Sequence, residues 1–151
     1  MYYAPIVKEL LEKKTGELAR QLAKVDPSAT IRQGIEIAKS LGAGSILVID
    51  DSDKLVRLVT NSNLRDAWLE GSNLDDPIAS IGIPGDKIRT VDVSRNTYEC
   101  LAFFARNYGH LPVTEEGKIV GLLTKGDVLF SLFGDGFRQS MTMEGRMPPG
   151  E

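Results

Sequence analysis

The sequence is poor in the residues that form disulfide bonds and catalytic sites: its 151 residues include one cysteine and one histidine. The lone Cys100 cannot form an intramolecular disulfide bond, so a reducing, cytoplasmic compartment is expected. The motifs His-Glu-x-x-His, Gly-x-Ser-x-Gly and Gly-x-x-x-x-Gly-Lys-Ser/Thr are absent. Nothing therefore assembles a nucleophile, a base and an orienting group, and the sequence predicts a protein without enzymatic activity, metal site or required cofactor.

Long apolar runs and an excess of positive charge are also missing. No segment approaches the roughly 18 continuous apolar residues of a membrane-spanning helix, and the N-terminus lacks the layout of a signal peptide. The net charge of −3 and the pI near 5.3 argue against nucleic acid as a partner, because its phosphates bind a basic surface. Hydrophobic residues still make up 42% of the chain, enough for the core of a soluble globular protein.

One short pattern occurs twice: an apolar strand ends at a threonine, an acid or amide follows three residues later, and a helix begins there. The second copy has Thr124 and Asp127, and the first has Thr60 and Asn63. The two threonines are 64 residues apart, and neighbouring elements match at offsets of 65 and 66. The offset changes only in loops, where insertions are tolerated. The pattern predicts two repeats packed sheet against sheet.

Each repeat is predicted to contain strand, helix, strand, strand and helix in that order. These elements cover residues 25–27, 31–41, 46–49, 55–59 and 62–70 in the first repeat, and 89–93, 97–108, 111–113, 119–123 and 126–133 in the second. The predicted fold class is α/β (α+β), with two β-α-β-β-α repeats related by a pseudo-two-fold axis. Its predicted parts are a leader helix (1–19), the repeats (20–71 and 88–133), a linker (72–87) with a helical turn at 77–81, and a flexible tail (134–151).

Two acids after the 46–49 strand, Asp50 and Asp51, allow a second interpretation. An apolar strand that ends in paired acids also begins phospho-accepting receiver domains and Asp-x-Asp phosphatases. Both need metal- and phosphate-binding groups on a helix or loop after the acids, whereas residues 54–59 return as a strand. A hairpin turn is the better interpretation.

The second repeat contains His110-Leu111-Pro112-Val113, followed over 117–127 by Gly-Lys-Ile-Val-Gly-Leu-Leu-Thr-Lys-Gly-Asp. With the order of elements, these residues resemble a tandem pair of cystathionine β-synthase (CBS) domains, also called a Bateman module. The first repeat is a looser match, through residues 45–50 and 54–65. Because only the leader and tail lie outside the two repeats, the chain resembles the stand-alone type.

The resemblance implies a non-catalytic regulatory sensor that binds an adenosyl small molecule in two clefts between the repeats: AMP, ADP, ATP or S-adenosylmethionine. The threonine and the acid of one repeat would hold the ribose, and the other repeat would line the base and phosphate region. One cleft would combine Thr124 and Asp127 with Lys24, Ala43, Ser45 and Ile46, and the other Thr60 and Asn63 with Thr90, Tyr108, His110 and Leu111. Lys125 is a further candidate cation.

The chemistry of the corner fits this role and also a purely structural one. A carboxylate can accept hydrogen bonds from both ribose hydroxyls, and a helix N-terminus favours phosphate. The same Thr-x-x-Asp spacing is a capping box, which needs no ligand. Asn63 replaces the acid in the first repeat, and Arg57 stands where the second repeat has Gly121. We therefore expect Arg57 to crowd or recharge that cleft, and the Asp127 cleft to be the better ribose site.

The helices predicted at 62–70 and 126–133 carry more apolar residues than one small module needs, so a homodimer through them is expected. An alternative is a protein-interaction adaptor with empty or vestigial clefts, which contacts a partner through the leader helix or the methionine-containing tail. The apolar residues of the two helices are Leu64, Ala67, Trp68, Leu69, Val128, Leu129, Phe130, Leu132 and Phe133.

Overall fold

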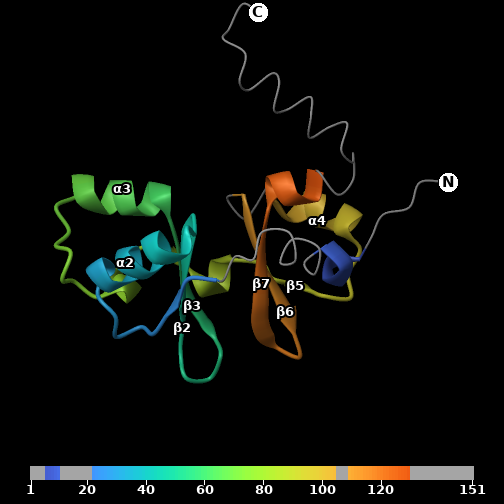
Figure 1. Cartoon of the computed structure of the whole chain (residues 1–151), viewed down its shortest axis with the longest axis horizontal. Helices are drawn as coiled ribbons and strands as arrows, with labels where there is room; N and C mark the ends of the chain where they lie inside the picture. Colours follow the sequence, from blue (N-terminus) through green and yellow to red (C-terminus); the bar gives the residue numbers. More distant parts are fainter. Residues whose placement is uncertain (1–5, 11–21, 105–108, 130–151) are drawn as a thin grey trace, which may run out of the picture.

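The computed structural model describes residues 6–10, 22–104 and 109–129, which form two sheets lying side by side with helices around them (Figure 1). The first sheet has the strand order β1-β2-β3-β4, and the second has the order β5-β6-β7. The predicted mixed fold of two repeats is confirmed. The strands are β1 (Lys24–Val25), β2 (Ser45–Ile49), β3 (Leu55–Thr60), β4 (Ile83–Pro84), β5 (Val91–Asp92), β6 (His110–Glu115) and β7 (Lys118–Thr124).

The two sheets share one register. In the first, β1 runs parallel to β2 with Val25 opposite Val48, and in the second β5 runs parallel to β6 with Val91 opposite Val113. Both antiparallel hairpins, β2–β3 and β6–β7, have an irregularity directly after the second valine of the pair. The sequence offsets of 66 and 65 residues therefore join equivalent backbone positions.

The helices begin and end where capping chemistry places them. Helix α2 (Ile31–Leu41) has a capping box between Thr30 and Gln33, and it ends at Gly42, whose φ of 65° is the left-handed conformation that glycine adopts readily. Helix α3 (Asn61–Leu69) begins after Thr60, one residue earlier than predicted. Helix α4 covers Thr97–Phe104, and its predicted continuation to 108 lies outside the described residues. The last helix begins at 125 and is described as far as 129.

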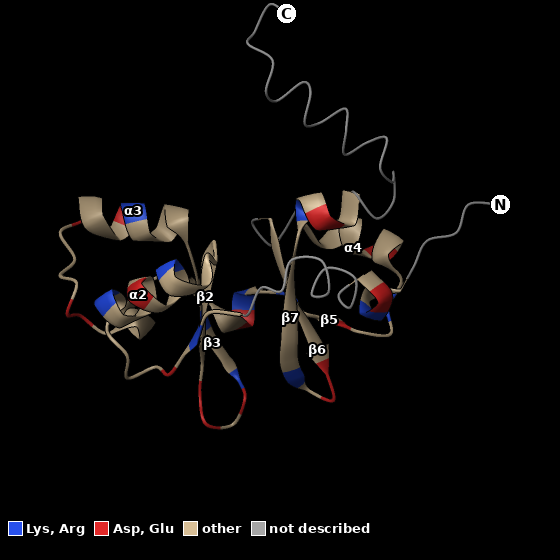
Figure 2. Cartoon of the chain, in the orientation of Figure 1, with Lys and Arg blue, Asp and Glu red and all other residues tan. Residues whose placement is uncertain are grey.

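The paired acids form the hairpin turn between β2 and β3. The Asp50 carboxylate accepts hydrogen bonds from the backbone N–H groups of Ser52 at 2.8 Å and Lys54 at 3.0 Å. Asp53 adopts a positive φ of 61°, as turn residues of this type can. Figure 2 shows this acidic loop at the lower edge of the view, below β2 and β3. The side chain of Asp50 therefore stabilises a turn, in agreement with the hairpin interpretation.

The segment 72–87, predicted as a linker, is packed against the first repeat. A 3-10 helix, η1 (Ile78–Ser80), lies within the predicted helical turn, and Ile78 is fully buried in the core of the repeat. Strand β4 was not predicted; it pairs antiparallel with β3 through Arg57 opposite Pro84 and Leu58 opposite Ile83. A second 3-10 helix, η2 (Gly85–Lys87), follows. These residues form a wall beside β3.

Residues 6–10 complete the second repeat in the way that η1 completes the first. The N–H group of Val7 donates to the carbonyl of Arg95 at 2.7 Å, and that of Ile78 donates to the carbonyl of Ala29 at 2.8 Å. Ala29 and Arg95 are equivalent at the 66-residue offset. Val7 is fully buried among the core residues of the second repeat. Val7 is thus part of the second repeat's core, and Leu10 packs against it.

The repeats meet through an apolar cluster between the sheets. Each side chain buried there contributes about 1.5–3 kcal/mol to folding, so the contact holds the two repeats together. One polar contact crosses it as well, because the ammonium of Lys24 donates to the carbonyl of Ile119 at 3.2 Å. The buried cluster consists of Leu47, Leu55, Leu58, Ile88 and Ile119.

None of the described helices is long and apolar enough to span a membrane.

Only part of the apolar face predicted on the two repeat-ending helices is exposed. Trp68 and Leu69 on α3 are exposed, with 70% and 77% of their surface accessible. Ala67 and Val128, predicted to be on the surface, are buried at 4% and 0%, and Val128 belongs to the core of the second repeat. Leu64 is half-buried against the first core. The predicted Phe130, Leu132 and Phe133 lie outside the described residues.

Candidate functional site

A cavity of about 620 Å³ lies at the corner between β3 and α3. This volume is in the range of small-molecule sites in proteins. One wall comes from the first repeat, a second from the segment 82–87, and a third from β6 of the second repeat. The lining residues are Thr60, Ser62, Asn63 and Asp66; Gly82, Ile83, Pro84 and Lys87; and His110.

The β3–α3 corner is held by a reciprocal pair of hydrogen bonds. The amide oxygen Oδ1 of Asn63 accepts from the backbone N–H and from the hydroxyl of Thr60, both at 2.9 Å. In return the backbone N–H of Asn63 donates to Oγ1 of Thr60 at 3.2 Å. This is the capping box that the sequence allowed, and it fixes both side chains at the cavity.

The corner of the second repeat has the same geometry. A carboxylate oxygen of Asp127 accepts from the backbone N–H of Thr124 at 2.8 Å, and the N–H of Asp127 donates to Oγ1 of Thr124 at 3.3 Å. Capping is therefore a role of both corners. A carboxylate has more than one acceptor site, so this bond does not exhaust the hydrogen-bonding capacity of Asp127.

Sheet register places one polar residue beside each corner threonine. Ser45 is opposite Thr60 at the β2–β3 edge, and His110 is opposite Thr124 at the β6–β7 edge. His110 nevertheless lines the cavity at the Thr60 corner. A residue of the second repeat thus reaches the site of the first, so the cavity lies between the repeats.

Some residues predicted for this cleft lie elsewhere. Thr60, Asn63 and His110 share the cavity, whereas Leu111 is fully buried in the core of the second repeat. Thr90 is exposed and does not line the cavity. Tyr108 lies outside the described residues.

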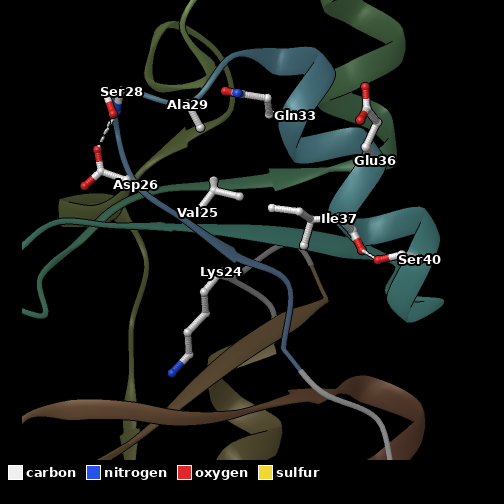
Figure 3. A pocket seen from close by; sticks show the side chains of 9 residues that line it. All are labelled: Lys24, Val25, Asp26, Ser28, Ala29, Gln33, Glu36, Ile37 and Ser40. Atoms are coloured by element: carbon white, nitrogen blue, oxygen red, sulfur yellow. Dashed lines mark hydrogen bonds between the residues drawn. The ribbon is translucent and has the colours of Figure 1, made fainter.

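Residues predicted for the Asp127 cleft divide among three environments. Ser45 and Ile46 are buried in β2, and Ala43 packs against the first core. Lys24 lines a depression of about 680 Å³ between β1 and α2, but its ammonium points away from α2 toward the second repeat (Figure 3). Neither Thr124 nor Asp127 lines that depression. At the 66-residue offset, the equivalents of the wall 82–87 are residues 16–21, which lie outside the described part of the chain.

Three polar residues of the described cavity were not predicted: Ser62, Asp66 and Lys87. Lys87 ends the segment 72–87, which the sequence predicts as a linker. The repeat offset was the available signal, since it identifies 82–87 as equivalent to a segment of the leader. Lys125, the cation favoured in the sequence, is exposed, and its backbone N–H donates to the Gly109 carbonyl at 3.3 Å.

Arg57 does not line the cavity and does not crowd it, contrary to expectation. Its guanidinium donates to the carbonyl of Gly82 at 3.2 Å. The side chain therefore stabilises the wall from behind. Arg57 does not line the cavity itself, but its guanidinium bonds to the backbone of Gly82, which does.

Cys100 and Asp26 have shifted pKa values, and neither residue lines the Asn63 cavity. Burial raises the pKa of the Cys100 thiol to about 11, which keeps it protonated at neutral pH. The Ser28 hydroxyl, followed by the Ser28 N–H, lowers the pKa of Asp26 through hydrogen bonds in an exposed turn. Among the residues that the structure describes, no group of three histidine, cysteine or acidic side chains is placed to hold a metal ion.

Comparison with known proteins identifies the duplicated architecture. Residues 79–134 match the family model of the CBS domain. An uncharacterized protein of Methanocaldococcus jannaschii is 28% identical over 116 residues, which are 72% of this chain and 38% of that protein. The chain therefore spans well under half the length of this relative.

Solved structures match over most of both chains. A protein with CBS domains from Burkholderia ambifaria has 28% identity and a TM-score of 0.71, covering 87% of this chain and 96% of that one. A CBS domain protein of Pyrobaculum aerophilum, solved in complex with AMP, has 20% identity and a TM-score of 0.69, covering 85% and 98%.

A CBS domain pair solved with 5′-methylthioadenosine and S-adenosylmethionine has 18% identity and a TM-score of 0.70, covering 89% of this chain and 99% of that one. At such identities the last two show the shared fold only. The family model matches the second repeat, the solved structures match along both repeats, and the two repeats share one register, so the chain has the fold of a tandem pair of CBS domains.

Proposed function

We propose that this CBS pair is a non-catalytic regulatory module of the cytoplasm that binds an adenosyl ligand in the clefts between its repeats. The observation that carries the proposal is the cavity at the Thr60–Asn63 corner, where a capped helix of one repeat faces His110 of the other. The bound AMP, 5′-methylthioadenosine and S-adenosylmethionine of the structural relatives support an adenosyl compound as the ligand class.

The lining groups match the parts of such a ligand. Thr60 and Ser62 offer hydroxyls to the ribose, and Gly82, Ile83 and Pro84 offer a partly apolar wall to the base. Lys87 and His110 supply donors for an anionic group. In the second cleft, Asp127 would accept hydrogen bonds from the ribose diol while its corner stays capped by the Thr124 N–H group.

Regulation through association is the second part of the proposal. Helix α3 and the helix that begins at 125 lie on the same side of the molecule (Figure 1). Trp68 and Leu69 are exposed side by side in sequence on α3. Large apolar groups exposed in this way are typical of contact surfaces, and we assign them to a homodimer. A ligand at the N-terminus of α3 would then act directly on the interface helix.

Calorimetric titration of ligand-free protein with AMP, ATP and S-adenosylmethionine tests the proposal. Asp127→Ala should abolish the binding of one ligand equivalent, whereas Asp127→Asn, which keeps an acceptor for the Thr124 N–H group, should retain the fold and weaken binding about tenfold through loss of a charge-assisted hydrogen bond. Thermal unfolding checks that both variants are folded. Absence of heat with all three compounds would refute adenosyl binding and leave the adaptor function.

A further inference from the structure

Two opposite charges face the Asn63 cavity from different elements without pairing. Asp66 lies on α3, one helical turn beyond Ser62, and Lys87 ends η2 on the opposite wall. Both side chains belong to exposed residues of the described chain, and no ion pair joins them. The cavity lining therefore carries one anionic and one cationic side chain that form no ion pair with each other.

The Asn63 side chain at the corner of this cavity presents hydrogen-bond donors to a ligand. The Thr60 backbone N–H can only donate, so the Asn63 atom 2.9 Å from it must be the amide oxygen. The Thr60 hydroxyl donates to the same oxygen. The side of Asn63 left to face a ligand is its NH2 group. Asp66 is the only residue with a carboxylate among the described lining residues, so it is the anionic acceptor of this cavity.

We propose that the Asn63 cleft selects an adenosyl compound whose side chain carries both a cationic and an anionic group, and that Asp66 is the residue that sets this specificity. The proposal rests on the proposed adenosyl-binding function. Asp66 receives the cationic group, as a sulfonium or ammonium, and Lys87 receives the carboxylate. Because the two side chains face one cavity without neutralising each other, a ligand with both charges satisfies both.

The same arrangement disfavours a polyphosphate. The described lining carries one lysine, one histidine and one aspartate, so its net charge is between zero and +1 depending on His110. A triphosphate brings about four negative charges at neutral pH, and Asp66 would repel those nearest to it. The cleft is thus matched in charge to a zwitterionic side chain and mismatched to ATP.

The single histidine of the chain gives a reporter inside this cleft. His110 is the only histidine in the chain and lines the cavity, so its imidazole C2–H resonance in proton NMR reports ligand occupancy there. The probes are S-adenosylmethionine and ATP, titrated into the full chain. The variants are Asp66→Asn, Lys87→Gln and the matched control Glu70→Gln, which removes one negative charge from an exposed residue at the end of α3 outside the lining.

The unmodified protein should bind S-adenosylmethionine more tightly than ATP at the His110 signal. Asp66→Asn should move the ratio of the two Kd values toward ATP by about tenfold, as expected when one unit charge is removed a few ångströms from a polyanion. Lys87→Gln should weaken both compounds, and Glu70→Gln should leave the ratio unchanged.

Tighter binding of ATP to the unmodified cleft, or equal ratios in Asp66→Asn and Glu70→Gln, would overturn the assignment of Asp66 while leaving adenosyl binding intact. A His110 resonance unmoved by either compound would overturn both proposals for this cleft. Thermal unfolding of each variant shows whether a loss of binding reflects a loss of fold.

Discussion

Replacing Gly85 by alanine should destabilise the protein by about 3 kcal/mol. A Cβ atom at this position would overlap the carbonyl oxygen of Leu55, a backbone atom that cannot rotate away. Relief requires η2 to move off β3, and overpacking of this kind costs about 1–3 kcal/mol. The movement would also strain the pairing of β4 with Arg57 and Leu58, at about 1 kcal/mol for each hydrogen bond lost.

Thermal unfolding followed by circular dichroism measures this effect. For a chain of this size, about 3 kcal/mol corresponds to a Tm lowered by about 6–12 °C. Gly44→Ala is the matched control, because a Cβ atom there meets no atom within 4 Å and the backbone φ is not positive. Its Tm should change by no more than about 2 °C. Equal effects of the two substitutions would show that η2 is not in close contact with β3 and that the cleft wall is not rigid.

Two further measurements address the core and the surface. Cys100 should react with iodoacetamide at pH 8 about 100-fold more slowly in the folded than in the unfolded protein from its thiolate fraction alone, because its pKa is raised from 9.0 to about 11; equal rates would contradict its burial. Because the folded state holds the Cys100 proton more tightly than the unfolded state, the free energy of unfolding should fall as the pH rises from 9 toward 11. Cys100→Ala should make the free energy of unfolding less dependent on pH over this range. Trp68→Ser combined with Leu69→Ser should convert a dimer to a monomer in sedimentation velocity while the monomer stays folded by circular dichroism, since both side chains are exposed in the monomer. A dimer that persists would place the interface elsewhere.

The parts of the fold that sequence could predict are those with local causes. Thr30 and Gly42 fixed the limits of α2 through a capping box and a left-handed glycine, and both act within a few residues. The hairpin at Asp50 follows from turn chemistry over the same short range. The duplicated corner at Thr60 and Thr124 was visible because equal local chemistry occurs twice at a constant offset.

The parts that sequence missed depend on partners far along the chain. Residues 82–87 have the glycine and proline content of a loop, and only their contact with β3 makes them a strand and a cleft wall. Val128 was likewise predicted to be exposed on its helix, whereas residues distant in the sequence bury it in the core of the second repeat. Arg57 was expected in the cleft because its equivalent, Gly121, is small, but its guanidinium reaches the Gly82 carbonyl, which local sequence could not indicate.

The two repeats are alike in residues that fix the backbone, and they differ in the acceptor residue at the corner where a ligand would bind. The valine pairs beside the bulges and the two corner threonines are the same in both repeats. The corner acceptor differs, as Asn63 in one repeat and Asp127 in the other.

A capping box needs only an acceptor for a backbone N–H, which amide and carboxylate provide equally well. The fold therefore tolerates either residue, while a ligand bound at the two proposed sites would meet NH2 donors at one corner and a carboxylate at the other. Duplication of the scaffold with a different acceptor at each corner would make the two proposed sites chemically unequal, so a ligand that suits the Asn63 corner would be a poor match for the Asp127 corner.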